Sequence, residues 1–579
     1  MSNDSLDPLL AALDEAKLRF GAGGAERVRE LLDSLASRSF PDAGSLIRFH
    51  EALLFIRAYP QDEPVMQRAE ELLASIPQRV EQLRGAGAGL ADMDSVETSG
   101  IAGSTTEESF SFDVLSWLLR RYPGKLRILW DGYDAAARMA ATWPRFLPLL
   151  EEESLVEANV PYREWLDAAR AQENDLAWLV ERYQRLPLPP DQKAELYQAL
   201  ELPIAWDLGA APATRTLNRQ PAREIFFQRE PLLRRNDVSL ERELGRDPMP
   251  VRTLLPADGE AVLDAAREGM AVRHRELYGF TYGDAEHVLA AEAGRGVEIF
   301  LCGLPPERRL PLRTYQGFVI YKNGIQVGYG DLVTLFDRTE LAFNHYYTFR
   351  HGESAWVYAA CMRLLRQVLG VTAFSVDPYQ IGLHNEEAIE SGAFWFYRKL
   401  GFRPLRPELA RLVKSEEQKI RTTPGYRTSL RKLRRIATGH ILYEAPGADA
   451  GAWDRFHIRH LMHAALRRLA ERGDLNTALE ATAAEVARAL DLGLADFPTA
   501  ERRAFDNFAP VLALIADLPE WPGEDKSALA DVIRAKAGPD ETGYLRLLRR
   551  HTRLRSQIIK LGSAAELRRK RKAAAGPAL

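Results

Sequence analysis

The chain has 579 residues, of which 46% are hydrophobic and 27% are charged. This length exceeds the size at which one hydrophobic core stops growing, so we expect several domains, and the composition excludes the fibrous, disordered and membrane classes. A formal net charge of −4 is too small for the whole chain to attract nucleic acid or a membrane surface.

The two cysteines, Cys302 and Cys361, cannot form a disulfide framework, and neither stands at a metal-ligand spacing. The acidic N-terminal residues lack the basic and apolar segments of a signal peptide, and no run of about 18 apolar residues occurs. We therefore expect a cytoplasmic protein without a metal cofactor and without membrane contact.

The first part of the chain has mainly helical patterning. Leucines at i, i+3, i+4 spacing predict an N-terminal helical region over 1–84. Gly, Ala, Ser and Thr dominate 85–110, which we interpret as a linker or long loop. Helical periodicity returns over 111–206 with proline interruptions, and a connecting segment, 207–247, contains a strand-like run at 225–227.

The pattern changes at about residue 248 to one that predicts a mixed α/β domain over 248–410. Asn323-Gly324 is a strong hairpin signal. Helical patterns cover 259–277 and 353–369. Strand composition is found over 251–255, 297–301, 314–321, 326–336, 340–349 and 373–377. One crossover unit with a mixed sheet and flanking helices follows from this order.

Apolar stripes predict a C-terminal helical domain over 411–562, followed by a basic, flexible tail at 563–579. The basic run 427–435 fits a solvated helix face or an interdomain seam better than a nucleic-acid site, so we regard nucleic acid as an unlikely partner. The expected fold class is thus a central α/β domain between N-terminal and C-terminal all-α regions.

Three consecutive segments indicate the chemistry: a strand at 340–349, a turn into a helix at 350–355, and a helix that closes on Phe-Tyr-Arg-Lys-Leu-Gly-Phe at 396–402. A strand that runs through small residues into a helix directs free backbone N–H groups and a positive dipole end at one point, which suits a pyrophosphate. The closing segment resembles the last helix of the GNAT superfamily of N-acetyltransferases, and the resemblance covers about 160 of the 579 residues.

The resemblance implies an acyl-CoA cosubstrate, most simply acetyl-CoA, beside the fourth strand of the family fold. Phe349 stands where the family's turn carries a basic residue, and Arg350 is one place later. The residues implied to bind the cofactor are Asn344, Tyr346, Tyr347, Arg350, His351, Gly352, Glu353, Ser354 and Ala355.

For catalysis the resemblance implies a phenol that protonates the departing thiolate and a carboxylate that takes a proton from the amine. Tyr397 matches the family's tyrosine, although it could simply anchor its helix to the sheet. Glu340 and Asp331 lie on predicted strands and are the candidate bases, and either could instead be a solvated, outward-facing residue. The candidate substrate-binding residues follow the last strand: Asp377, Gln380, His384 and Asn385.

Two functions remain open at this stage. The first is an acyl-CoA-dependent N-acyltransferase that acts on an unidentified amine, either a small molecule or a protein. The second is a non-catalytic scaffold or binding protein in which a degenerate GNAT-like domain holds CoA or nothing. The sequence leaves the oligomeric state undetermined, and function must be argued from the site.

Overall fold

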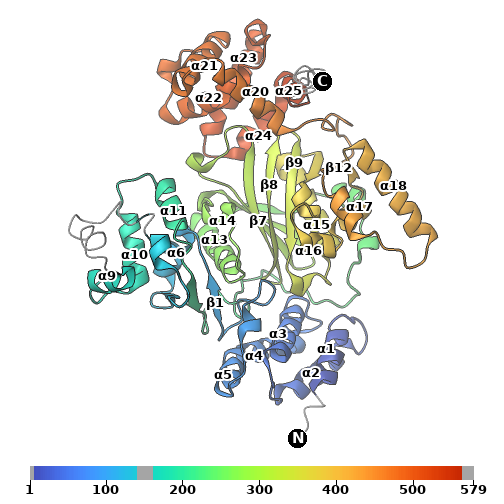
Figure 1. Cartoon of the computed structure of the whole chain (residues 1–579). Coiled ribbons are helices and arrows are strands. Elements are labelled where there is room, and N and C mark those ends of the chain that lie inside the picture. The colour runs from blue at the N-terminus through green and yellow to red at the C-terminus, as the bar shows by residue number, and fades with distance from the viewer. Residues whose placement is uncertain (1–5, 140–141, 143–160, 564–579) are drawn as a thin grey trace, which may run out of the picture.

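The computed structural model describes residues 6–139, 142 and 161–563. A large mixed sheet occupies the centre, with helical groups at both ends and on both sides (Figure 1). The expected multidomain chain with a mixed sheet and flanking helices is confirmed at this level. Part of the second helical region (140–141 and 143–160) and the basic tail from 564 onward lie outside the described residues.

The central sheet has nine strands in the order β11-β12-β10-β9-β8-β7-β6-β5-β4. Only β9 and β10 are parallel, and the other neighbours are antiparallel. In chain order the strands are β4 (Val251–Thr253), β5 (Val288–Gly294), β6 (Val297–Cys302), β7 (Thr314–Lys322), β8 (Ile325–Leu335), β9 (Arg338–His345), β10 (Ala373–Val376), β11 (Arg403–Pro404) and β12 (Ile441–Glu444).

The hairpin expected at Asn323-Gly324 joins β7 to β8. Both residues have positive φ, 51° and 78°, as a type I′ turn requires. The run 225–227, expected as a strand, is not one. The Asn323 side chain accepts a hydrogen bond from the N–H of Phe226 (2.8 Å) and donates one to its carbonyl (3.0 Å), so these backbone groups have no need of a strand partner.

Strand β12 corrects the expectation that 411–562 is wholly helical. This four-residue run lies between β11 and β10, and Ile441 pairs with Val376. Its inner positions, Ile441 and Leu442, are fully buried. A run this short carries little periodicity of its own, and its burial against β10 decides its conformation.

Helices cover both faces of the sheet. Two residues that are directly opposite each other on neighbouring strands lie on the same face of the sheet. His345 and its partner Gly328 therefore lie on one face, and Asn344 and its partner Tyr329 lie on the other. The first face carries α15 (Ser354–Leu369), since His345 bonds Ser354. The second carries α13 (Pro256–Ala271) and α14 (Tyr278–Thr281).

The N-terminal helices pack against one end of the sheet, where α3 contacts β8 and the segment after β9. Their bounds are α1 (Leu6–Ala16), α2 (Gly24–Ala36), α3 (Ala43–Ala58), α4 (Glu63–Ala74) and α5 (Ile76–Gly85). Asp42 and Asp62 cap α3 and α4 by accepting from the N–H groups of Ser45 and Val65.

A second, three-stranded antiparallel sheet has the order β1-β3-β2. Its strands are β1 (Thr105–Glu108), β2 (Leu126–Ile128) and β3 (Ile204–Asp207). The segment 85–110, expected as a linker, thus contributes β1, and 111–206 is not purely helical. The described helices around this sheet are α6 (Phe112–Arg121), α7 (Ala135–Met139), α9 (Tyr162–Ala169), α10 (Asp175–Gln184) and α11 (Pro190–Gln198).

The C-terminal helices gather at the opposite end of the sheet (Figure 1). They are α20 (Ile458–Ala470), α21 (Leu475–Ala489), α22 (Thr499–Leu512), α23 (Gly523–Ala537), α24 (Glu541–Arg550) and α25 (Thr552–Gly562). The remaining helices are α12 (Leu240–Leu244), α16 (Glu386–Glu390), α17 (Ala393–Lys399), α18 (Pro407–Thr422) and α19 (Leu430–Ile436). Among the described residues, no helix is both long enough and apolar enough to cross a membrane.

Candidate functional site

The parallel strands β9 and β10 separate after a short pairing. Residues 373–375 of β10 pair with 338–340 of β9. After Val376 the chain turns at Asp377, which accepts a hydrogen bond from the N–H of Tyr379, and Pro378 has no N–H with which to continue the ladder. Among the described residues, 341–345 of β9 therefore have no neighbouring strand on the β10 side.

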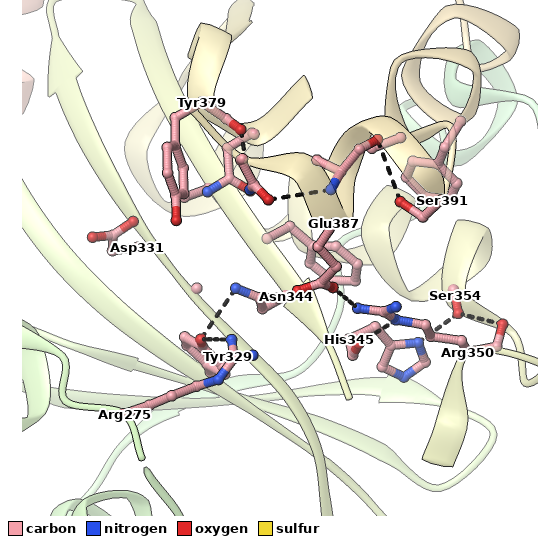
Figure 2. Close-up of a pocket in the computed structure, with 18 of the residues that line it drawn as sticks. Arg275, Tyr329, Asp331, Asn344, His345, Arg350, Ser354, Tyr379, Glu387 and Ser391 are labelled. Carbon is pink, nitrogen blue, oxygen red and sulfur yellow. Dashed lines mark hydrogen bonds and ion pairs between the residues drawn. The ribbon is translucent and has the colours of Figure 1, made fainter. Parts of the chain in front are cut away.

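A cleft of about 820 Å³ opens beside this part of β9 (Figure 2). Its walls come from β8, β9, the segment that follows α13, the segment that follows β10, and α17. Of the residues predicted for the site, seven line it: Asp331, Asn344, Arg350, Ser354, Gln380, Asn385 and Tyr397. Residues from all three predicted classes therefore face one space.

Backbone N–H groups of β9 also point into the gap between β9 and the segment that follows β10. The N–H of Tyr346 bonds the carbonyl of Val327, on the β8 side. Because strand N–H groups alternate between the two edges, the N–H of Phe343 and that of His345 point away from β8. The N–H groups of Phe343 and His345 are therefore the candidate donors for a carbonyl placed in the gap.

Asp331 and Tyr397, the candidate base and the candidate acid, both line the cleft. Burial raises the pKa of Asp331, which also accepts a hydrogen bond from the Tyr315 hydroxyl at 3.1 Å. Tyr397 is 4% exposed, burial raises its pKa, and its hydroxyl has no hydrogen-bond partner among the described residues. Tyr397 is thus a neutral phenol at physiological pH.

The turn after β9 has two sides. On the cleft side, Arg350 pairs with Glu387 at 2.6 Å and stacks its guanidinium on Tyr347, 3.7 Å from the ring centre. The Ser354 hydroxyl lies 2.5 Å from the Nδ1 of His345. Burial lowers the pKa of His345 to about 3, so this histidine is neutral and does not shuttle protons near pH 7.

On the far side, the N-terminal helices cover the turn. A Cβ on Gly352 would lie 2.4 Å from the Tyr59 hydroxyl, which also accepts a weak bond from the N–H of Glu353 at 3.5 Å. The Glu353 carboxylate is buried and pairs with Arg295 at 2.5 Å and with Lys322 at 3.9 Å. Gly352 and Glu353 therefore face packed protein.

Other predicted residues also lie outside the cleft. Tyr346 is buried against Met270 and Arg273, and Ala355 is buried. His351 and His384 are exposed and do not line the cleft.

Several lining residues were not predicted from the sequence. Arg275 donates to the Tyr329 hydroxyl at 2.8 Å, and Asn344 donates to the same oxygen at 3.1 Å (Figure 2). Burial raises the pKa of Glu276, a second carboxylate in the cleft. The period-2 pattern of β8 places Tyr329 on the face of Asp331, so that residue could have been found. Arg275 and Glu276 follow α13, and only tertiary packing brings them to β8.

Glu340 and Asp377 line a second cavity, of about 280 Å³, rather than the cleft. Both carboxylates lie 3.4 Å from the Nε2 of His440, the residue before β12. One ligand atom from each of the three residues lies within 4.8 Å of the other two, a spacing that a divalent cation could use. Burial alone would lower the pKa of His440, but hydrogen bonds to Asp377 and Glu340 outweigh it and raise that pKa.

Comparisons with protein-family models, with curated proteins and with solved structures found no match to this chain. Its function is therefore argued from the geometry of the site.

Proposed function

We propose that the chain is an acyl-CoA-dependent N-acyltransferase, with the cleft between β9 and β10 as its active site. The observation that carries this proposal is the separation of these two parallel strands. It leaves a free strand edge and an 820 Å³ cleft beside the turn that leads into α15. A pantetheine arm could form hydrogen bonds with the free edge of β9, in the place where a further strand would pair. Its thioester carbonyl would then lie near the N–H of Phe343.

In the proposed reaction a neutral amine attacks the thioester carbon and forms the new C–N bond. Negative charge develops on the carbonyl oxygen, where the N–H of Phe343 stabilises it. Asp331 takes the proton that the amine nitrogen gives up. The C–S bond then breaks, and Tyr397 donates its proton to the CoA thiolate. Holding both reactants in one cleft supplies part of the rate.

The position of Tyr59 favours a second candidate, a scaffold with a degenerate domain. The hydroxyl of Tyr59 occupies the side of the turn where a pyrophosphate would need Gly352 and the N–H of Glu353. In the first proposal a pyrophosphate must instead approach from the cleft side, at Arg350 and Ser354. A cleft that binds no CoA therefore favours the scaffold, whereas a cleft that binds CoA leaves turnover of acetyl-CoA as the property that separates the two candidates.

Calorimetric titration with acetyl-CoA tests the proposal, using Ser354→Glu and the isosteric, uncharged Ser354→Gln. Both side chains add the same bulk at the first residue of α15, but only glutamate repels a pyrophosphate. We expect saturable binding to the wild type, weaker binding to Ser354→Gln and none to Ser354→Glu. Absence of binding to the wild type would favour the scaffold.

A further inference from the structure

The second cavity continues the cleft along three walls. The walls of the cleft include Asp331 on β8, Ala342 on β9 and Tyr379 after β10. On each of these three segments, the residue two positions away lines the second cavity. The corresponding cavity residues are Val333 on β8, Glu340 on β9 and Asp377 after β10. Ala342 pairs with Asp331 and Glu340 with Val333, so these wall residues of the two spaces lie on one face of the sheet. Two residues of strand span about 7 Å.

Two guanidinium groups in the second cavity lack a carboxylate partner. Arg313 and Arg338 line it, and neither forms an ion pair within 4 Å among the described residues. Arg338 donates to the Ser375 hydroxyl (3.2 Å) and to the carbonyl of Phe456 (3.4 Å). The guanidinium of Arg313 has no hydrogen-bond partner among the described residues, and only its backbone carbonyl accepts a bond, from Lys536. Burial lowers the pKa of each arginine. Partly buried, unpaired guanidinium groups favour an oxyanion ligand.

The N-terminus of α20 opens on the same cavity, which is lined by His457, Ile458 and Arg459. His457 stands at the N-cap position without a capping hydrogen bond from its side chain, and burial lowers its pKa to about 4. The positive end of a thirteen-residue helix therefore adds to the charge of the arginines.

We propose that the second cavity is the acceptor subsite, and that the acceptor is an amine with a remote carboxylate or phosphate group held by Arg313 and Arg338. This inference rests on the proposed function. The amine would lie in the cleft beside Asp331, and the anionic group would lie one or two same-face positions further along β9. The distance between them is thus about 7 to 13 Å.

A divalent cation on Glu340, Asp377 and His440 is the alternative occupant of the second cavity. The cation would bring two positive charges in place of the single proton on His440. The cavity also holds three arginines. Arg338 and Arg313 both act on Glu340 electrostatically. Repulsion of this kind opposes a metal and favours an anion.

Calorimetry without acetyl-CoA tests the inference with three probes: 5-aminopentanoate, 4-aminobutylphosphonate and the uncharged-tail control pentylamine. The test variant is Arg313→Met, which removes the unpaired charge and keeps the side-chain length. Arg435→Met, at an exposed arginine of α19 that does not line the cavity, is the control. A charge-assisted bond is worth roughly 1.5–3 kcal/mol, so we expect binding to weaken at least about tenfold in Arg313→Met and to stay unchanged in Arg435→Met.

The two anionic probes distinguish a carboxylate acceptor from a phosphate acceptor by which one binds more tightly. Equal binding of pentylamine and the anionic probes, no binding of any probe, or anion binding that EDTA abolishes would overturn the inference. Because acetyl-CoA is omitted, a bound anion in a protein that fails to bind acetyl-CoA would refute the acyltransferase and retain an anion site.

Discussion

Replacement of His274 should remove a pH-dependent part of the stability. The imidazole is 11% exposed in its side chain, and its Nε2 and Nδ1 lie 3.0 Å from Asp94 and 2.8 Å from Glu108. Hydrogen bonds to these carboxylates raise the pKa of His274 to about 9, against 6.5 for a free histidine. The cluster ties Asp94, before β1, and Glu108, the last residue of β1, to the segment that follows α13 and lines the cleft.

The magnitude follows from this difference of about 2.5 pH units. At about 1.4 kcal/mol per unit, the protonated histidine contributes at most about 3.5 kcal/mol to the free energy of unfolding. Since the pKa is raised in the folded state, the contribution is fully present below pH 6.5 and is lost as the pH rises through 9. The protein should therefore lose stability over this window.

Urea unfolding from pH 6 to pH 10 measures this loss in the wild type, in His274→Asn and in the control His384→Asn. Both histidines have positive φ, 54° and 58°, which asparagine tolerates, but His384 is exposed. We expect His274→Asn to be the less stable protein at pH 6 and to be nearly insensitive to pH across the window. A titration midpoint of His274 near 6.5 in NMR spectra of histidine-labelled protein would refute the reasoning.

Four further substitutions have expected outcomes. Asp331→Asn should lower kcat/KM about 100-fold or more and remove the acidic limb of the pH–rate profile, and an unchanged limb would exclude Asp331 as the base. Tyr397→Phe should lower kcat with little change in acetyl-CoA affinity, whereas full turnover would mean that Tyr397 only anchors α17. Glu353→Gln removes the buried carboxylate that pairs with Arg295 and Lys322 and should cost about 3–5 kcal/mol in urea unfolding. Glu387→Gln, at a largely solvated pair, should cost under about 1 kcal/mol.

The sequence predicts β4 and the strands β6 to β10 of the central sheet, but it does not predict the seven-residue strand β5. The runs that became β7, β8 and β9 are strongly apolar or alternate clearly, and Asn323-Gly324 joins two of them as expected. Strand β12 was missed because four residues carry little periodicity, and the run 225–227 was overpredicted because the Asn323 side chain bonds Phe226.

The site could be predicted only in part, because alternation along a strand determines the face on which a residue lies but not the cavity it lines. Asp331 and Glu340 share a face, yet Asp331 lies in the cleft and Glu340 lies in the next cavity. No local pattern shows that Tyr59, almost 300 positions earlier, covers Gly352. This long-range packing is the reason that Arg350 and Ser354 line the cleft, whereas Gly352 and Glu353 in the same turn face packed protein.

The structure of the protein with acetyl-CoA bound tests the central claim most directly. We expect the pantetheine arm between β9 and the segment after β10, with the thioester oxygen within hydrogen-bond distance of the N–H of Phe343 and the sulfur near the Tyr397 hydroxyl. The pyrophosphate should lie beside Arg350 and Ser354. Acetyl-CoA bound elsewhere, or a cleft that stays empty at saturating acetyl-CoA, would contradict the proposed acyltransferase.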